Sequence, residues 1–186
     1  MTVRRIRYLG DPVLRQQAQS VTSFDRELRA LVADLTDTML DAHGGGIAAP
    51  QIGVGLRVFT YHVDGVVGHV VNPQVTVVGE EEQLGPEGCL SIPGLPFDCR
   101  RWLRVVTTGF TEQGESLTLP GTGRLAMVAQ HETDHLDGVL FVDRLDPETQ
   151  ARAIEAIRAA EWSDAAAPVV RLSPHAPLRR SGSVSR

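Results

Sequence analysis

The sequence predicts an α+β domain in which short antiparallel sheets pack around a central helix, with one further helix near each end of the chain. Three observations support this fold class. Apolar residues recur at helical spacing in one segment near each end of the chain, strand-like segments rich in Val, Ile and Thr lie between the first two predicted helices, and dipeptides typical of tight turns join neighbouring strands as hairpins.

The N-terminal part is expected to contain one short strand and the first helix. Ile6–Tyr8 has the composition of a strand. The helix is expected to open at Thr22, which forms a capping-box pattern with Asp25, and to run to about His43. One face of this helix is predicted to be buried, because apolar residues recur at Leu28, Leu31, Val32, Leu35 and Met39.

The middle of the chain is expected to begin with a hairpin. Leu56–Val63 and Val66–Val71 are strand-like, and Asp64-Gly65 between them is typical of a tight hairpin turn. Gln74–Val78 is predicted to add a strand. Gly85–Pro96 is predicted to be irregular, because Gly and Pro are frequent in it.

A second hairpin and the central helix follow. Arg101–Phe110 and Glu115–Leu119 are predicted to be strands joined across Gln113-Gly114. The glycine-containing segment 121–123 then leads into a helix that is expected to extend through Leu136.

The last helix is predicted from its N-terminus. Asp146 is a suitable cap and Pro147 suits the first helical position, so we expect a helix to about Trp162. Residues 163–186 consist mainly of Ser, Pro, Ala and Arg without periodicity, and we expect them to be disordered. The predicted organisation is a catalytic domain over 1–162 and a tail over 163–186.

Composition and charge limit the class of protein. The 186 residues fit one domain, and 42% hydrophobic with 22% charged residues is ordinary for a globular protein. No apolar run approaches the roughly 18 residues of a membrane span, and no signal core follows the N-terminal arginines, so we expect a cytosolic protein without membrane contact. In that compartment Cys89 and Cys99 are expected to be free thiols, ligands or nucleophiles. The net charge is −5, although the segment 165–186 holds four arginines and no acid.

The strongest chemical pattern is His131-Glu132-Thr133-Asp134-His135. On a helix it places two imidazoles on one face, with Cβ atoms about 6 Å apart, a gap that one metal ion can bridge. Glu132 lies beside this face, where a carboxylate can take a proton from water at the metal and pass it to a leaving group. The alternative is a pair of salt-bridged histidines on a surface helix.

A hydrolytic metal site needs a third protein ligand and an open position. Phe141 stands at the third-ligand position of the pattern H-E-x-x-H-x-x-G-x-x-H, and its side chain cannot bind a metal. Glu155 lies about twenty residues downstream, as in other zinc proteases, but Arg152 and Arg158 flank it as on a solvated helix. Cys89, in a Gly- and Pro-rich stretch that can bend around an ion, is the other candidate, unless it is simply a small buried cysteine.

Three segments resemble the signature motifs of the peptide deformylases in their order and approximate spacing. They are Gly44-Gly45-Gly46-Ile47-Ala48-Ala49-Pro50-Gln51, Glu87-Gly88-Cys89-Leu90-Ser91 and Gln130-His131-Glu132-Thr133-Asp134-His135. The similarity extends from about Gly10-Asp11-Pro12 to the helix that ends near Trp162. It therefore covers nearly everything except the tail.

This resemblance implies a metal and a substrate. Cys89, His131 and His135 would hold one divalent ion, which is Fe²⁺ in many members and which Zn²⁺, Ni²⁺ or Co²⁺ can replace. The substrate would be the N-formyl-methionyl end of a nascent chain, cleaved by water to formate and a free amine.

The resemblance also implies catalytic roles. Glu132 would move a proton from water to the departing nitrogen, and the oxyanion would be stabilised by the Gln51 side chain and the Leu90 backbone N–H. Without the other motifs, Gln51 would be interpreted as a loop glutamine that hydrogen-bonds nearby backbone. Asp134 is expected to support the metal-binding helix by orienting a neighbouring side chain, or else to be an ordinary surface residue.

The substrate-binding residues are implied in the same way. The run Gly44, Gly45 and Gly46 lacks the Lys and Ser of a phosphate-binding loop, which excludes nucleotide binding, and its backbone would instead bind an extended peptide as an added strand. Met127 and Val128 would line a methionine-sized pocket, with a place in the core as the alternative.

The sequence departs from the family pattern at two places. Gly45 stands where a branched apolar residue is usual, which affects substrate affinity or preference. Many members place an arginine near the substrate downstream of the cysteine motif, but here Leu95-Pro96-Phe97 precede Arg100 and Arg101, so that contact is not carried over.

Partners and rival functions complete the expectations. The helix 147–162 resembles the C-terminal helix through which some members contact the ribosome, and the basic tail would add a salt-sensitive attraction to RNA, unless it is only a solvated end. We expect a monomer. The rivals are a zinc peptidase with Glu155 as third ligand and a silent paralogue that binds ribosome or peptide without turnover; the latter is suggested by Gly45 and the tail and opposed by the intact catalytic residues.

Overall fold

The computed structural model of the chain describes residues 2–160 and 162. The helices, single-turn 3-10 helices (η) and strands follow in the order η1 Pro12–Arg15, α1 Arg26–Asp41, β1 Gly46–Ala48, η2 Ala49–Ile52, β2 Val58–Val63, β3 Val66–Val77, β4 Glu82–Cys89, β5 Ile92–Trp102, β6 Arg104–Phe110, β7 Ser116–Thr122, α2 Arg124–Leu136, η3 Phe141–Asp143 and α3 Pro147–Ala159.

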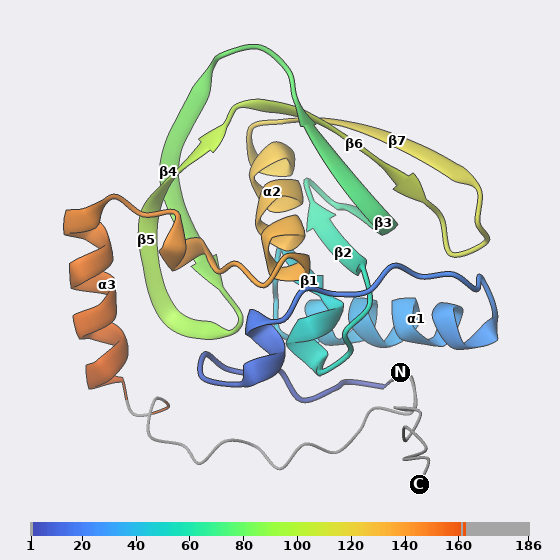
Figure 1. Cartoon of the computed structure of the whole chain (residues 1–186), viewed down its shortest axis with the longest axis horizontal. Helices are drawn as coiled ribbons and strands as arrows, with labels where there is room; N and C mark the ends of the chain where they lie inside the picture. Colours follow the sequence, from blue (N-terminus) through green and yellow to red (C-terminus); the bar gives the residue numbers. More distant parts are fainter. Residues whose placement is uncertain (1, 161, 163–186) are drawn as a thin grey trace, which may run out of the picture.

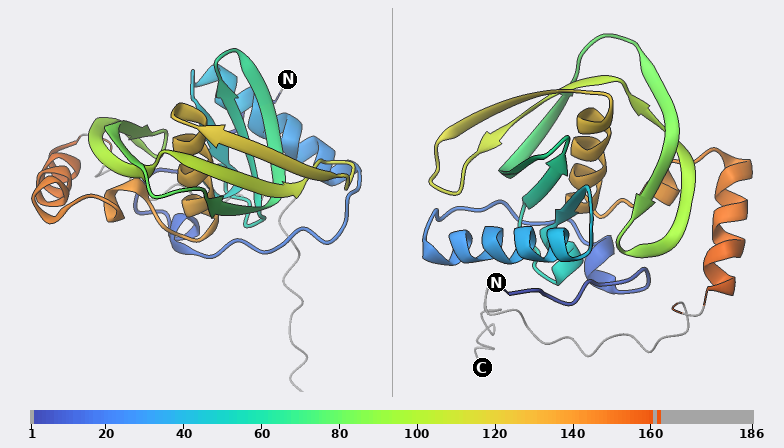
Figure 2. Two further views of the ribbon diagram at one scale, coloured as in Figure 1. Left: turned by 90° about the horizontal axis from the view of Figure 1, so that it is seen from above. Right: turned by 180° about the vertical axis from the view of Figure 1, so that it is seen from behind.

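The strands form two separate antiparallel units. Five of them make one sheet in the order β1-β2-β3-β6-β7, and β4 pairs with β5 in a two-stranded ribbon. Helix α2 lies between the ribbon and the larger sheet (Figure 1). Helix α1 packs against β1 and β2, while α3 packs against β5 on the opposite side of the molecule (Figure 2). This is the predicted α+β fold, with a central helix and one helix near each end.

Helix α1 begins three residues later than the capping-box pattern predicted. Its N-cap is Asp25, whose carboxylate accepts hydrogen bonds from the N–H groups of Glu27 and Leu28. Asp25 caps better than Thr22 would, because its acceptor carries a full negative charge at the positive end of the helix dipole. The predicted apolar face is confirmed, since its five residues are all buried in the core.

Two predicted strands, Ile6–Tyr8 and Gln74–Val78, are not found as separate strands. Ile6–Tyr8 is extended but belongs to no sheet, and it is held by isolated hydrogen bonds such as Arg7 N–H to Gln51 O at 2.7 Å. Gln74–Val78 is not a separate strand, because β3 continues from Val66 to Val77 across an irregularity between Val71 and Gln74. The intervening Pro73 lacks the N–H that a regular ladder needs, so the chain bulges and resumes its pairing.

The segment Gly85–Pro96 is not irregular, as the sequence predicted, but belongs to the β4–β5 ribbon. Its prolines are tolerated because each strand of a two-stranded ribbon has one edge without a partner, where a missing N–H costs no ladder hydrogen bond. The predicted strand Arg101–Phe110 is divided at Leu103, where the chain leaves β5 and enters β6 of the larger sheet.

The remaining elements agree with the sequence in kind and differ in their ends. β7 continues to Thr122, three residues beyond the predicted end, and α2 ends at Leu136 as predicted. Asp146 caps α3 and Pro147 is its first residue, but the helix ends at Ala159 rather than Trp162. The tail 163–186 lies outside the described residues. Within the described part of the chain, no helix is long and apolar enough to cross a membrane.

Candidate metal centre and active site

The centre of the candidate site is one face of α2. His131 and His135 are one turn apart on this helix, their ring centroids are 4.9 Å apart, and the two residues are 7% and 1% exposed. Glu132, between them, is also buried. The sequence predicted that both imidazoles share a face, and the structure confirms this. The alternative of two histidines on a surface helix is wrong, because α2 is enclosed between the two sheets.

Cys89, the last residue of β4, joins the two histidines. Its Sγ lies 3.1 Å from His135 Nε2, and ligand atoms of the three residues all lie within 4.8 Å of one another. The Ser91 N–H and Gln51 Nε2 also donate to this sulfur, at 3.4 and 3.6 Å. The turn between β4 and β5 thus carries the sulfur to the histidine face of α2.

The rival third ligands are elsewhere. Glu155 is exposed on α3 and does not belong to the one cluster of potential metal ligands found among the described residues. Phe141 is a packing partner of the site, because its ring stacks on His131 with centroids 6.1 Å apart. Of the candidates that the sequence left open, only Cys89 is brought to the histidines.

The three residues fit a divalent transition metal. Bonds of about 2.0 Å to nitrogen and about 2.3 Å to sulfur place the ligands of one ion roughly 3 to 4 Å apart, close to the spacing found here. His131 Nδ1 lies 2.6 Å from Glu87 Oε1, which leaves His131 Nε2 for an ion. One sulfur and two nitrogens form a set that suits zinc or ferrous iron better than Mg²⁺ or Ca²⁺, which prefer oxygen.

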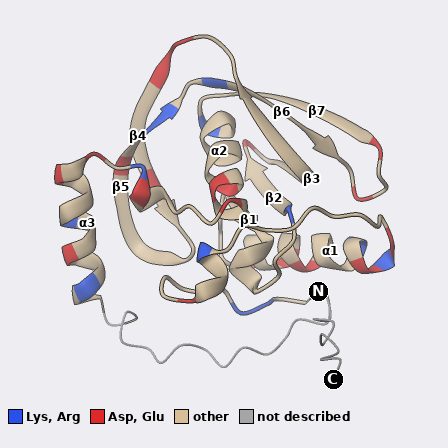
Figure 3. Ribbon diagram, viewed as in Figure 1, with Lys and Arg blue, Asp and Glu red and all other residues tan. Residues whose placement is uncertain are grey.

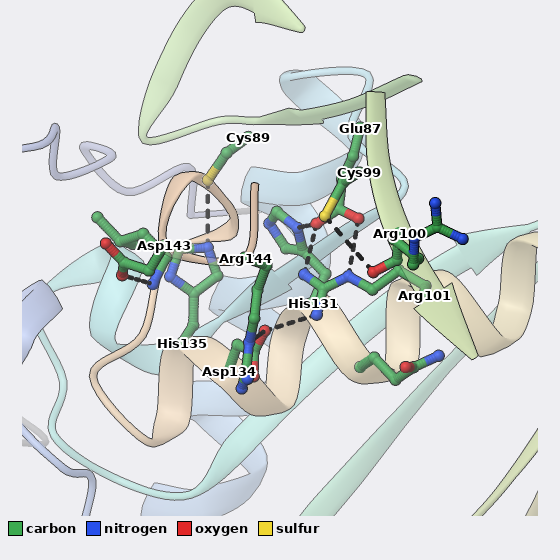
Figure 4. Close-up of polar contacts among 12 residues, drawn as sticks. Glu87, Cys89, Cys99, Arg100, Arg101, His131, Asp134, His135, Asp143 and Arg144 are labelled. Carbon is green, nitrogen blue, oxygen red and sulfur yellow. Dashed lines mark hydrogen bonds and ion pairs between the residues drawn. The ribbon is translucent and has the colours of Figure 1, made fainter. Parts of the chain in front are cut away.

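A buried charge network supports His131 from behind (Figure 4). Arg101, on β5, donates to both carboxylate oxygens of Glu87 at 2.9 and 2.7 Å, and to Asp134 at 2.6 Å. Arg144 binds the other side of Asp134 at 2.6 Å. The predicted supporting role of Asp134 therefore has a geometry: it anchors the arginine that holds Glu87 against His131.

The network fixes the ionisation of its members. Burial alone would raise the pKa of Glu87, but hydrogen bonds from Arg101 and His131 outweigh it and lower this pKa to about 2. Burial alone would lower the pKa of His131, but its hydrogen bonds to Cys89 and Glu87 raise it well above its ordinary value. Glu87 is therefore an anion at any working pH, and a metal ion binds His131 through its neutral imidazole.

Sequence reasoning did not identify Arg101 as part of the site. Its partners Glu87 and Asp134 each belong to a motif, and Arg101 follows Cys99 on the inward side of β5, since both are buried while Arg100 is exposed. A buried arginine on the inner side of a strand indicates a charge partner, but the sequence does not show that side. Neither Arg100 nor Arg101 lines the large cavity described below.

The Glu132 carboxylate sits in a pocket of its own beside β1. A Cβ on Gly46 would lie 2.4 Å from Glu132 Oε1, so Gly46 is required for the carboxylate to fit. Oε2 has no hydrogen-bond partner among the described residues, although it is buried. Burial raises the pKa of Glu132 to about 7. An unpartnered buried oxygen with this pKa is suited to exchange protons with a reacting group.

Gln51, in η2, is oriented by hydrogen bonds at both ends of its amide. Oε1 accepts from the Ala48 N–H at 2.8 Å, and Nε2 donates to Ser91 Oγ at 3.2 Å and toward Cys89 Sγ. The interpretation of Gln51 as a loop glutamine bound to backbone is thus correct for its oxygen only. Its donor end points toward the cysteine.

The site opens into a cavity of about 820 Å³. The cavity wall includes all of the predicted site residues except His135, namely Gly44, Gly45, Gly46, Gln51, Cys89, Leu90, Met127, Val128, His131 and Glu132. Met127 and Val128 both line it and also pack in an apolar cluster with β2 and β3, so the two interpretations of these residues hold together. Gly44 makes room for Leu90, because a Cβ there would lie 2.9 Å from Leu90 Cδ1.

Comparisons with known proteins agree with this geometry. A family model described as polypeptide deformylase matches residues 3–151. The chain is 59% identical to a peptide deformylase of Acidothermus cellulolyticus over 175 residues, which is 94% of this chain and 96% of that protein. The crystal structure of peptide deformylase from Thermus thermophilus is similar with a TM-score of 0.79 at 42% identity, over 84% of this chain and 94% of that one.

A second solved structure is similar over a comparable length. The peptide deformylase of Ehrlichia chaffeensis in complex with actinonin has a TM-score of 0.79 at 30% identity, over 87% of this chain and 99% of that one. The motifs, the fold and the clustered site agree with these relatives over nearly the whole described chain. The chain belongs to the polypeptide deformylase family.

Proposed function

We propose that Cys89, His131 and His135 hold the catalytic metal ion of this hydrolase and that Glu132 is its general base and acid. As a member of the family, the chain removes the formyl group from N-formylmethionyl ends of nascent polypeptides and releases formate. The observation that carries the residue assignment is the convergence of three ligand atoms within 4.8 Å beside a buried carboxylate.

We propose that the metal site binds one divalent ion and that several metals can serve as this ion. When bound, a divalent ion supplies Lewis acidity and lowers the pKa of water, which makes neutral-pH hydrolysis of an amide feasible. We propose Fe²⁺ as the ion in the cell, with Zn²⁺, Ni²⁺ and Co²⁺ as functional replacements. The mixed donor set supports this range, because thiolate and imidazole bind all of these metals.

The residues of the chain account for the proton transfers. Glu132 takes a proton from the attacking water as the water oxygen bonds to the formyl carbon. It then returns this proton to the methionine nitrogen as the carbon–nitrogen bond breaks, leaving a free amine and formic acid, which loses its remaining proton to become formate. The position of Glu132 supports both steps, since its unpartnered oxygen belongs to a residue of the cavity wall.

Two donors are proposed to stabilise the oxyanion that forms between these steps. They are the Gln51 side-chain N–H and the Leu90 backbone N–H. For Gln51, the support is the hydrogen bond that fixes its amide oxygen at Ala48, because this bond directs the two N–H groups toward the site. Leu90 lies next to Cys89 in the same turn and lines the same cavity.

The peptide is proposed to bind in the large cavity. Its backbone would lie along Gly44, Gly45 and Gly46, and its methionine side chain would enter the apolar wall formed by Met127 and Val128. The cavity is large enough for a short peptide. We expect actinonin, which is bound to the Ehrlichia chaffeensis relative, to compete for this cavity.

The location, oligomeric state and ribosome contact of the protein are also proposals. We propose a cytoplasmic monomer whose catalytic domain spans residues 1–162, with α3 and the basic tail 163–186 as its contact with the ribosome. Trp162 supports this boundary, because its indole N–H donates to Pro93 O at 3.2 Å and so ties the end of the described chain to β5. Ile154 on α3 is 42% exposed, and this helix carries charges of both signs (Figure 3).

The test is formate release from formyl-Met-Ala-Ser by anaerobically purified protein, with metal content measured on every sample. Glu132→Gln is expected to retain its metal and lose about a hundredfold or more in kcat, the usual contribution of a general acid–base group. Glu155→Gln is the matched control, because it removes a carboxylate that is exposed on α3. Wild-type activity in Glu132→Gln, or metal loss in Glu155→Gln, would contradict the assignment.

A further inference from the structure

Arg124 is an unpaired charge at the edge of the cavity. It is the first residue of α2, it is exposed, and it lines the wall together with Val128, Met127 and Glu132 from the same helix. It is the only arginine among the described residues of that wall. Arg124 makes no hydrogen bond or ion pair with any described residue. An arginine without a partner beside a substrate cavity is free to bind a ligand carboxylate.

The position of Arg124 is fixed by its neighbours. Gly123, immediately before it, donates its N–H to Leu103 O at 3.0 Å and accepts a hydrogen bond from Gln83 Nε2 at 2.8 Å. These contacts tie the start of α2 to the β5–β6 junction and to β4. The guanidinium is therefore attached to a constrained point of the backbone.

Because Gly45 has no side chain, the space beside the Arg124 guanidinium stays open. A Cβ added to Gly45 would lie 3.5 Å from Arg124 Nη2 and 3.8 Å from Val128 Cγ2. A branched side chain at position 45 would add atoms beyond that Cβ, in the space beside the guanidinium and Val128. The glycine thus allows Arg124 to lie beside the backbone run 44–46, along which the substrate peptide is proposed to bind.

A second cavity, of about 460 Å³, meets the first one at this point. Gly44 and Arg124 line both cavities, and the second is also lined by His62 and Asp64. Asp64 forms no ion pair with Arg124 in the described structure, although it faces the same space. The junction gives a substrate side chain room to turn away from the peptide backbone toward the guanidinium.

The distance along α2 indicates which part of a peptide reaches Arg124. Glu132 and Arg124 are eight residues apart, or about 12 Å along the helix axis. The two side chains themselves reach neighbouring residues of the run 44–46, because a Cβ on Gly46 would meet Glu132 Oε1 and a Cβ on Gly45 would meet Arg124 Nη2. An extended peptide advances about 3.3 Å per residue, so a peptide whose formyl group lies at Glu132 reaches the Arg124 guanidinium within its first three residues. The first of these residues, methionine, is proposed to bind the apolar wall of Met127 and Val128, which leaves the second and third residues for Arg124.

We infer that Arg124 makes this enzyme prefer substrates with an acidic side chain at the second or third residue, counting the formylated methionine as the first. The inference rests on the proposed function, since it assumes that the peptide lies in the cavity with its formyl group at Glu132. A carboxylate at either position meets an arginine that has no competing anion in contact with it.

The test compares kcat/KM for four amidated peptides: formyl-Met-Glu-Ala, formyl-Met-Ala-Glu and their Gln counterparts. The C-terminal amide removes the terminal carboxylate, which would otherwise reach Arg124 in so short a peptide. Wild-type enzyme is expected to favour Glu over Gln about threefold at one of the two positions, the effect of a partly exposed ion pair. This ratio is expected to approach one in about 1 M salt, where the screening length falls to about 3 Å.

Variants assign the preference to Arg124. Arg124→Gln is expected to bring the Glu-to-Gln ratio to one, and Arg124→Glu to bring it below one. Gly45→Val is expected to reduce the ratio by displacing the guanidinium. Arg29→Gln, which removes an exposed arginine on α1, is the control for net charge and should keep the wild-type ratio.

Failure of the Arg124 preference and failure of the proposed deformylase activity give different results. A wild-type ratio of one at both positions, or a ratio that Arg124→Gln leaves unchanged, overturns the inference while activity on the Gln peptides upholds the proposed function. Absence of formate from all four peptides with the metal-loaded wild type overturns the proposed function itself.

Discussion

The two ends of the cavity are built on opposite principles. At the metal end the charges behind His131 are paired: the side chains of Glu87, Arg101 and Asp134 are only 1%, 5% and 11% exposed, and Arg101 binds both carboxylates. At the substrate end the wall is glycine backbone and apolar side chains, and its one arginine, Arg124, has no partner among the described residues. The reaction therefore depends on a rigid network, whereas the choice of substrate depends on a few replaceable side chains.

The difference has an energetic reason. Burying charges is costly, and their mutual attraction repays that cost only when geometry and hydrogen bonding are both good. The metal end meets this condition, and in return it holds the His131 ring in one orientation. The substrate end cannot be built in this way, because a side chain whose donors and acceptors are already hydrogen-bonded cannot bind a peptide through them.

Removing the central cation of the metal end should have the largest effect. Arg101→Met leaves Glu87 and Asp134 buried without their counter-charge, and we expect a loss of about 3–5 kcal/mol in the free energy of unfolding. Urea denaturation at equal metal saturation measures it. The control is Arg144→Gln, which removes a partner of the same Asp134 whose side chain is 50% exposed, and we expect at most about 1 kcal/mol. Equal losses in the two variants would show that the buried Arg101 stabilises the fold no more than the exposed Arg144 does.

Substitutions of Gly46 and Gly45, two neighbouring glycines of the cavity wall, should also differ in their effect on kcat, with the larger loss at the metal end. Gly46→Ala places a Cβ 2.4 Å from Glu132 Oε1, so the carboxylate must move, and we expect kcat to fall about a hundredfold. Gly45→Ala meets its nearest neighbour at an ordinary 3.5 Å, and its loss should be much smaller. Steady-state kinetics on formyl-Met-Ala-Ser measures both. A larger loss for Gly45→Ala would reverse the comparison.

A smaller effect is expected where the network meets the metal. Glu87→Gln keeps the shape of the side chain but removes the charge that orients His131, and metal affinity should fall about 10- to 100-fold. Competition with a chelator of known affinity measures this change. The variant should recover kcat when metal is in excess, because Glu132 is untouched. An unchanged affinity would mean that the hydrogen bond to Glu87 does not tune the ligand.

The helices and the histidine pair are predictable because their information is local. His131 and His135 share a face through the period of the helix, and Asp146 with Pro147 marks the start of α3 by residue type alone. The same kind of local reasoning placed the start of α1 at Thr22, because Asp25 was interpreted as the partner of Thr22 in a capping box, whereas it is itself the N-cap.

The features that could not be predicted from the sequence are those that depend on contacts between residues far apart in the chain. The β4–β5 ribbon looks like a loop because its glycines and prolines disfavour an isolated strand, and only its partner makes it one. Arg101 finds Asp134 across 33 positions of sequence, and no local pattern announces that contact. Gly46 was assigned to the substrate, whereas its first requirement is space for Glu132.

The two cysteines provide the most direct test of the metal-site assignment. Both are buried, Cys89 at 8% and Cys99 at 3% exposure, and they belong to one apolar cluster, so their loss should disturb packing to a similar extent. Only Cys89 faces the histidines, while burial and the nearby Glu87 charge raise the pKa of Cys99 to about 11 and keep its thiol protonated.

The measurement is metal stoichiometry and formate release for Cys89→Ala beside Cys99→Ala, both checked for folding by circular dichroism. We predict that Cys89→Ala folds but loses its bound metal and its activity, and that Cys99→Ala keeps both. A folded Cys89→Ala protein with a full complement of metal would contradict the assignment of the site.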